Sequence, residues 1–219
     1  EADSITYSAA ELKYNNNDCA AAIAGFNNYL AQFATGAFAL EANYFRSECY
    51  AKSKDWPNAV IGYSYVNSKG LSRYFEKASL AAARISYFEL KDYSNAKKYF
   101  STLKAGAVNQ ENLLEALRGL IRCQYQLKDY AEANETAKEL LAKKGISTDD
   151  KSVAYLVLGK SLQVNNNFTD AIAAFKSCAG INKSAWGAEA RYEIASCLFS
   201  LNNYASAEKA AQLAIRETS

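Results

Sequence analysis

A short motif that recurs six times along the chain is the strongest constraint on its fold. Each copy begins with Asp or Asn, followed by an aromatic residue (Cys19 in the first copy) and, three residues after that, by an alanine. Self-similarity at a fixed period of this size is typical of repeat proteins, in which each repeat packs on the next. The alanines, at spacings of 37, 37, 37, 38 and 36 residues, are Ala22, Ala59, Ala96, Ala133, Ala171 and Ala207.

The motif predicts the start of a helix. Asp and Asn are good N-caps because their side-chain oxygen accepts a hydrogen bond from the amides of the first turn. Asp129, with Glu132 three residues later, fits a capping box, and Pro57 stands in a first turn, where a missing N–H does no harm. Five of these helices are followed by a glycine suited to a left-handed C-cap, namely Gly36, Gly70, Gly106, Gly145 and Gly180.

A second helix is expected upstream of each cap, so each repeat is a helical hairpin. When the motif alanine is numbered position 20 of its repeat, position 3 is small in all repeats but the first, which has Ile5. Small side chains let two helices approach closely, and a single hairpin cannot bury its apolar face alone. The sequence therefore predicts an all-α single domain over 1–219, with approximate repeats 3–39, 40–76, 77–113, 114–151, 152–187 and 188–219.

Two stretches carry a family resemblance. Residues 42–50 (ANYFRSECY) leading to Asp55-Trp56, and residues 190–198 (ARYEIASCL) leading to Asn203-Tyr204, resemble the tetratricopeptide repeat. The resemblance implies a right-handed α-solenoid of six helix-turn-helix repeats that binds proteins. The period is about 37 rather than 34 residues, similar to long copies in bacterial cell-envelope proteins such as the Tol–Pal-associated periplasmic coordinator and the repeat lipoprotein of the barrel-assembly machinery.

Composition excludes several classes of function. The chain has no His, so histidine-based catalytic triads, HExxH zinc sites and Cys2His2 zinc fingers cannot form within it, and no CxxC motif occurs. Its 25 basic and 23 acidic residues nearly balance, which argues against nucleic acid as a partner. The uncharged stretch 19–40 contains Asn27, Asn28 and Gln32, so we expect no membrane insertion.

The five cysteines are expected to be structural. Cys49, Cys123 and Cys197 all stand at position 10, two repeats apart, which is too far for a disulfide among them. Cys19 and Cys178 are also expected to be structural, with no predicted partner. Unpaired cysteines favour a reducing cytosol, whereas the resemblance implies the periplasm or cell envelope, so both compartments stay open.

One face of each first helix is the candidate partner-binding surface. Positions 2, 5, 9 and 12 cluster on the side away from the paired helix, and the resemblance implies that this side lines a concave groove. Position 9 is Glu11, Glu48, Ile85, Arg122, Lys160 and Ser196, which predicts an acidic first third and a basic patch beyond it. The alternative is that these side chains stack between adjacent first helices and only close the groove. The predicted contact residues are Tyr7, Tyr14, Tyr44, Glu48, Phe88, Arg118, Arg122, Tyr125, Lys160, Tyr192 and Phe199.

The sequence predicts a non-enzymatic scaffold that holds a peptide or helix of a partner protein, with no cofactor, metal or catalytic residue. The lysine and asparagine clamp by which some family members bind peptide carboxylates is not matched. One alternative is the recognition module of a larger envelope protein, and another is a hidden active site built from Glu41, Glu48, Glu115 or Glu189.

The last repeat has no polar capping helix, so further repeats, another domain or a homomeric contact is expected there. Glu1 is not expected to be the natural start, which leaves a signal peptide or lipid anchor open.

Overall fold

The computed structural model describes residues 2–181 and 184–218, and all regular secondary structure in these ranges is helical. The chain divides into two compact units, Glu1–Ala116 (unit 1) and Leu117–Ser219 (unit 2), with the boundary inside one helix. The expected all-α class is confirmed, and a single continuous domain over 1–219 stays a prediction.

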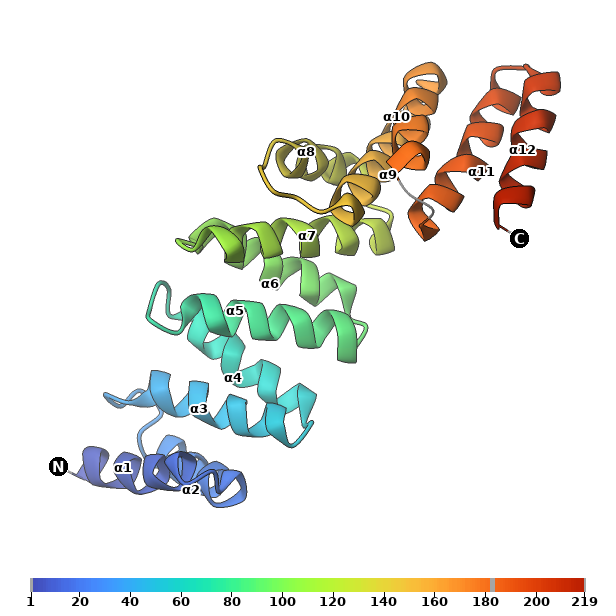
Figure 1. The fold of residues 1–219 in the computed structure, drawn as a ribbon. Helices are drawn as coiled ribbons and strands as arrows, with labels where there is room; N and C mark the ends of the chain where they lie inside the picture. Colours follow the sequence, from blue (N-terminus) through green and yellow to red (C-terminus); the bar gives the residue numbers. More distant parts are fainter. Residues whose placement is uncertain (1, 182–183, 219) are drawn as a thin grey trace. The chain divides into compact units, whose positions relative to one another are not determined.

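Unit 1 consists of consecutive helical hairpins. Neighbouring helices pack in chain order, and α1 also contacts α3, so the first helices lie along one side of the unit (Figure 1). The elements are α1 (Ala2–Asn15), α2 (Cys19–Gln32), α3 (Ala39–Lys52), α4 (Trp56–Ser68), α5 (Phe75–Arg84), the π-helical segment η1 (Ile85–Glu89), α6 (Tyr93–Gly106) and the first part of α7 (Gln110–Leu127).

Unit 2 repeats the same architecture. From α8 onward each helix packs against the next, and α9 also contacts α11. The elements are the remainder of α7, α8 (Tyr130–Leu141), α9 (Thr148–Val164), α10 (Phe168–Ile181), α11 (Ala185–Ser200) and α12 (Tyr204–Thr218). Each second helix begins at the residue directly after its motif Asp or Asn, as predicted.

The motif alanines form the core of both units. All six are buried, and the small residues at position 3 are buried in every repeat after the first. Ala96 and Ala133, which would face water in a chain without stacked repeats, are fully buried. Close packing of small side chains therefore brings the helices together, as the repeat pattern predicts.

Most of the predicted caps form. The side chains of Asp18, Asp55 and Asp92 accept hydrogen bonds from backbone amides of the following turn, and Asn167 and Asn203 do the same. The predicted capping box at Asp129 is wrong, because its side chain makes no cap hydrogen bond. A capping box forms instead at Ser147 and Asp150, at the start of α9. Sequence spacing alone does not decide which Asp rotates toward the helix.

The turn inside each hairpin has one conformation throughout. The residue at position 15 has positive φ in all six repeats, although none of them is glycine. The next amide then bonds back to a carbonyl five residues earlier in five of the six repeats, which satisfies the end of the first helix. The predicted glycine C-cap holds for Gly70, which directly follows Lys69, the cap residue of α4. Gly145 has positive φ but lies three residues beyond Ala142, the cap residue of α8, and Gly36, Gly106 and Gly180 do not have positive φ, so the prediction is wrong for these four. The position-15 residues are Asn17, Lys54, Lys91, Lys128, Asn166 and Asn202.

The π-helical segment η1 absorbs a one-residue shift in the third repeat. Phe38 stacks on Tyr7 and Tyr74 stacks equivalently on Tyr44, at ring-centroid distances of 4.5 and 4.3 Å. Phe38 and Tyr74 lie 36 residues apart, whereas the motif residues that follow them, Asp55 and Asp92, lie 37 residues apart. The segment from Tyr74 to Asp92 is therefore one residue longer than the segment from Phe38 to Asp55. The wider π turn accommodates the extra residue. As a result, Arg84 occupies the place in the third repeat that Glu48 occupies in the second, where it pairs with Glu115. Residue counting predicts Ile85 there, but Ile85 is buried.

The prediction that no cysteine is paired is wrong for two residues. Cys19 on α2 and Cys49 on α3 form a disulfide, with Cα atoms 5.0 Å apart. Cysteines at equivalent positions are too far apart to pair, whereas position 17 of the first repeat and position 10 of the second are direct neighbours. Cys178 and Cys197 are buried thiols, and burial raises their pKa values to about 12 and about 11.

Candidate functional site

The predicted contact residues fall on first helices in both units. Tyr7 and Tyr14 lie on α1, Tyr44 and Glu48 on α3, and Phe88 in η1, all in unit 1. Unit 2 holds the remaining six, which are Arg118, Arg122, Tyr125, Lys160, Tyr192 and Phe199.

Unit 1 brings its tyrosines and glutamates into direct contact. Tyr14 and Tyr44 both donate their hydroxyl hydrogens to Glu48, the latter at 3.0 Å, and Tyr7 donates to Glu11 at 2.9 Å. We call these five residues the tyrosine–glutamate cluster. Glu48 therefore bridges two first helices, because Tyr14 comes from α1 and Tyr44 from α3.

The rings of this cluster also serve the stacking of the repeats. Tyr7 and Tyr44 are buried, each stacked on the aromatic residue that precedes the next first helix. These two rings therefore pack between one first helix and the start of the next, and their contact with a partner stays a prediction. Tyr14, Glu11 and Glu48 are only half-buried. Their carboxylates and ring edge therefore remain accessible to solvent, whereas the rings of Tyr7 and Tyr44 are buried.

The cluster carries negative charge without a matching cation. Among the described residues, neither Glu11 nor Glu48 forms an ion pair, and both have only tyrosine hydroxyl donors. Burial, followed by Glu48, raises the pKa values of Tyr14 and Tyr44, so both phenols stay protonated donors. Cations do lie on nearby rings: Lys52 Nζ is 5.6 Å from the Tyr14 ring centroid, and the Arg73 guanidinium is 4.7 Å from that of Tyr74.

Phe88 lies apart from this cluster. It is exposed in η1, with its ring edge-on to Tyr87 at 4.9 Å. The π turn presents it to solvent at the end of the first helix of the third repeat.

The cations predicted as a basic patch in unit 2 are neutralised by carboxylates that sequence reasoning missed. Arg118 Nε donates to Asp150 at 2.7 Å, and Arg122 donates to Asp149 at 2.6 Å and to Asp150 at 3.5 Å. Asp150 is 1% exposed. Burial alone would raise its pKa, but hydrogen bonds from Arg118 and Ser147 outweigh burial and lower it. The expectation of an unopposed basic surface is therefore wrong.

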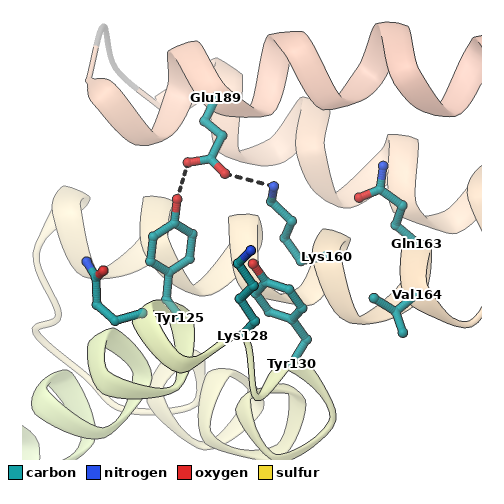
Figure 2. A pocket seen from close by; sticks show the side chains of 8 residues that line it. Tyr125, Lys128, Tyr130, Lys160, Gln163, Val164 and Glu189 are labelled. Atoms are coloured by element: carbon teal, nitrogen blue, oxygen red, sulfur yellow. Dashed lines mark hydrogen bonds and ion pairs between the residues drawn. The ribbon is translucent and has the colours of Figure 1, made fainter. Parts of the chain in front are cut away.

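Tyr125 and Lys160 line a pocket of about 470 Å³ in unit 2 (Figure 2). Lys160 Nζ lies 2.8 Å from Glu189 and 2.6 Å from Glu193, and Tyr125 donates to the other oxygen of Glu189. Burial lowers the Lys160 pKa, but hydrogen bonds to the two glutamates more than offset this and raise it. The pocket lining is completed by Gln126, Lys128, Tyr130, Gln163 and Val164.

Tyr192 and Phe199 on α11 are exposed and do not line this pocket. Phe199 packs edge-on against Tyr204, at 5.1 Å between ring centroids, at the α11–α12 hairpin. The structure thus places the predicted residues of unit 2 in three separate places, the Arg–Asp cluster, the pocket and the last hairpin.

The carboxylates considered for a hidden active site are each held by a neighbouring side chain. Glu41 pairs with Arg73, Glu115 with Arg84, and Glu189 with Lys160, while Glu48 accepts from tyrosines. No group of three or more potential ligands in the described ranges could hold a metal ion. Within the same ranges, every helix is too short or too polar to cross a bilayer.

Solved structures with similar folds share little sequence with this chain. The crystal structure of MamA is 14% identical with a TM-score of 0.62, over 83% of this chain and 93% of MamA. MamA AMB-1 is 16% identical with a TM-score of 0.59, over 80% of this chain and 97% of that one. A tetratricopeptide repeat protein from Parabacteroides merdae is 14% identical with a TM-score of 0.51, over 98% of this chain and 79% of that protein. At this identity the likeness concerns the fold alone.

Sequence comparison adds the family assignment. No curated protein matches the sequence. The tetratricopeptide repeat family profile matches residues 7–64 and 156–219, which is more than half of the chain. The protein therefore belongs to the tetratricopeptide repeat family.

Proposed function

We propose that this protein is a non-enzymatic scaffold whose tyrosine–glutamate cluster in unit 1 holds a basic segment of a partner protein. A tetratricopeptide repeat fold is a scaffold for protein–protein interaction. The observation that carries the proposal is the environment of Glu48, which accepts two tyrosine hydroxyls and has no cationic partner among the described residues.

A lysine or arginine side chain of the partner has the chemistry that this cluster lacks. It would pair with the half-buried carboxylates of Glu11 and Glu48. Preformed rings and carboxylates bind without an ordering cost on the side of the scaffold.

The pocket of unit 2 would take a different kind of side chain. Lys128 and Lys160 are balanced there by Glu189 and Glu193, so no net charge attracts an ion. The Lys160 ammonium has three N–H donors, of which Glu189 and Glu193 accept two. The third donor is left for a hydrogen-bond acceptor of the partner. An uncharged polar group, such as an amide, is therefore the matching guest.

The test is selection from a random-sequence peptide library displayed on phage. We expect peptides selected by the wild type to be enriched in Lys and Arg, and this enrichment to be lost with the Glu11→Gln, Glu48→Gln double variant. Glu135→Gln is the matched control, because it removes one exposed carboxylate on α8. Equal Lys and Arg content in the peptides selected by wild type and double variant would overturn the proposal.

We also propose that the scaffold works in the cell envelope or periplasm. The Cys19–Cys49 disulfide supports an oxidising compartment and removes the argument for a cytosol that rested on unpaired cysteines. The check is alkylation of the chain in intact cells, followed by mass spectrometry without reduction. We expect a linked pair of peptides containing Cys19 and Cys49, and alkylation of both thiols would refute the location.

A further inference from the structure

The first repeat exposes side chains that every other repeat buries. Positions 3 and 10 of the first helix are at most 8% exposed in the five later repeats, when the third repeat is aligned in its shifted register. In α1 the same positions are Ile5 and Leu12, which are 70% and 58% exposed. The buried equivalents are Ala42, Ala78, Ala116, Ala154 and Ala190 at position 3, and Cys49, Ile85, Cys123, Ser161 and Cys197 at position 10.

The preceding hairpin buries these positions, and the register of the contact is fixed. The Cys19–Cys49 disulfide joins position 17 of one repeat to position 10 of the next. Phe45, at position 6, packs against Phe26 and Tyr14, at positions 24 and 12 of the preceding repeat, with centroids 6.3 and 4.6 Å away. The first and second repeats therefore meet through positions 12, 17 and 24 on one side and positions 6 and 10 on the other.

The last hairpin carries the opposite half of this contact. Phe199 at position 12 and Tyr204 at position 17 are 63% and 56% exposed, whereas the aromatic residue at position 17 is at least partly buried in the other hairpins that have one. Together with small residues they border an apolar groove of about 330 Å³. The groove is lined by Ala195, Phe199, Tyr204, Ala207, Glu208 and Ala211.

Side-chain sizes at the two faces are complementary. Between the first two repeats a large Phe26 at position 24 meets small partners, Ala42 and Cys49. On the α11–α12 hairpin the residue at position 24 is the small Ala211, and on α1 the residues at positions 3 and 10 are the larger Ile5 and Leu12. The large and small side chains have therefore changed places relative to the contact between the first two repeats. Volume-conserving exchanges of this kind keep an apolar interface filled.

We propose that these faces are the two halves of one interface, and that α1 of one copy of this chain docks on the α11–α12 groove of a second copy in the register used between repeats. Leu12 then lies beside Tyr204 of the second copy, as Cys49 lies beside Cys19 within the chain. The contact is heterologous, so it joins copies head to tail. It uses neither the tyrosine–glutamate cluster nor the unit 2 pocket, and therefore stands independently of the proposed function.

The test is light scattering coupled to size-exclusion chromatography on the 219-residue chain over a dilution series. We expect the wild-type mass to rise with concentration, and Leu12→Glu and Tyr204→Glu each to be monomeric alone. An equimolar mixture of the two variants should give a dimer, because one supplies an intact groove and the other an intact α1 face. Leu71→Glu, an exposed substitution away from both faces, should associate like the wild type.

Three outcomes would overturn the proposal. A wild type that is monomeric throughout would mean that another segment or another protein covers these faces. Self-association that survives either single variant would place the contact elsewhere. A mixture that stays monomeric, while circular dichroism shows both variants folded, would exclude the head-to-tail geometry.

Discussion

Cys19 and Cys49 are 30 residues apart in the chain, yet a disulfide joins them across the contact between α2 and α3. It connects the second helix of one hairpin to the first helix of the next, so it fixes the same contact that the repeats otherwise make by packing. The tyrosine–glutamate cluster lies directly beside it, because Glu48 precedes Cys49 on α3.

Removing this disulfide should destabilise the protein. For a closed loop of this length, loop-closure entropy predicts that the Cys19→Ser, Cys49→Ser variant loses about 3.6 kcal/mol of unfolding free energy. Urea denaturation followed by circular dichroism measures the loss. A thiol reductant should lower the stability of the wild type toward that of the variant and leave the variant unchanged. A wild type insensitive to reductant would contradict the expectation.

Asp150→Asn should cost about 2 to 4 kcal/mol of stability at neutral pH, because it removes a buried carboxylate that holds Arg118 and Arg122. The folded-state pKa of Asp150 is lowered, so its contribution is present above the unfolded pKa of about 4 and is lost as pH falls through the folded value. The stability difference between wild type and variant should therefore shrink in acid.

Asp149→Asn is the matched control for that prediction. Asp149 also pairs with Arg122, but its side chain is 52% exposed, and Asn would still accept the hydrogen bond that Trp186 Nε1 donates to this position at 2.8 Å, so the substitution should cost less than about 1 kcal/mol. Denaturation of all three proteins across a pH series provides the comparison. Equal losses for the two variants would show that burial of Asp150 does not govern the strength of this cluster.

The sequence predicted the parts of the fold that depend on local chemistry. The motif residues start their helices because an Asp or Asn side chain satisfies amides in its own turn, and Ala96 and Ala133 are buried because only a small side chain fits there. Both the capping residue and the buried alanine recur once in every repeat, so the sequence period is enough to predict them. The approximate position of each first-helix contact residue follows from the same periodicity.

Features that depend on contacts between repeats could not be predicted in this way. The charge partners of Lys160 and Arg118 come from the next first helix, more than 25 residues away, so counting charges along one face missed them. The shift at η1 has no signature in the motif spacing, because the 37-residue period is preserved there. Positive φ at Lys54 has no sequence signal either, because glycine is the residue that favours this conformation.

Gly159 and Gly180 should respond oppositely to alanine. A Cβ at Gly159 would lie 2.5 Å from Cδ1 of Phe175, whose ring is fully buried and cannot move aside, so Gly159→Ala should cost about 1 to 3 kcal/mol. Gly180 lies in α10 with open space around it, so Gly180→Ala should stabilise by about 0.5 to 1 kcal/mol. Thermal denaturation of the two variants measures both signs, and destabilisation by both would contradict the packing described for α9 and α10.

Alkaline pH should unfold the protein through its buried tyrosines. Burial is the main cause that raises the pKa values of Tyr7, Tyr44 and Tyr63 far above 10.0, and it raises that of Tyr29 to about 12. These phenols ionise more readily in the unfolded chain, so the stability they confer is complete below pH 10 and declines as pH rises toward the folded values. Tyrosinate absorbance and far-ultraviolet circular dichroism, followed together, should show a late group of tyrosines that ionises only as helix is lost. Ionisation of all 16 tyrosines with the helices intact would contradict the buried placement of these four.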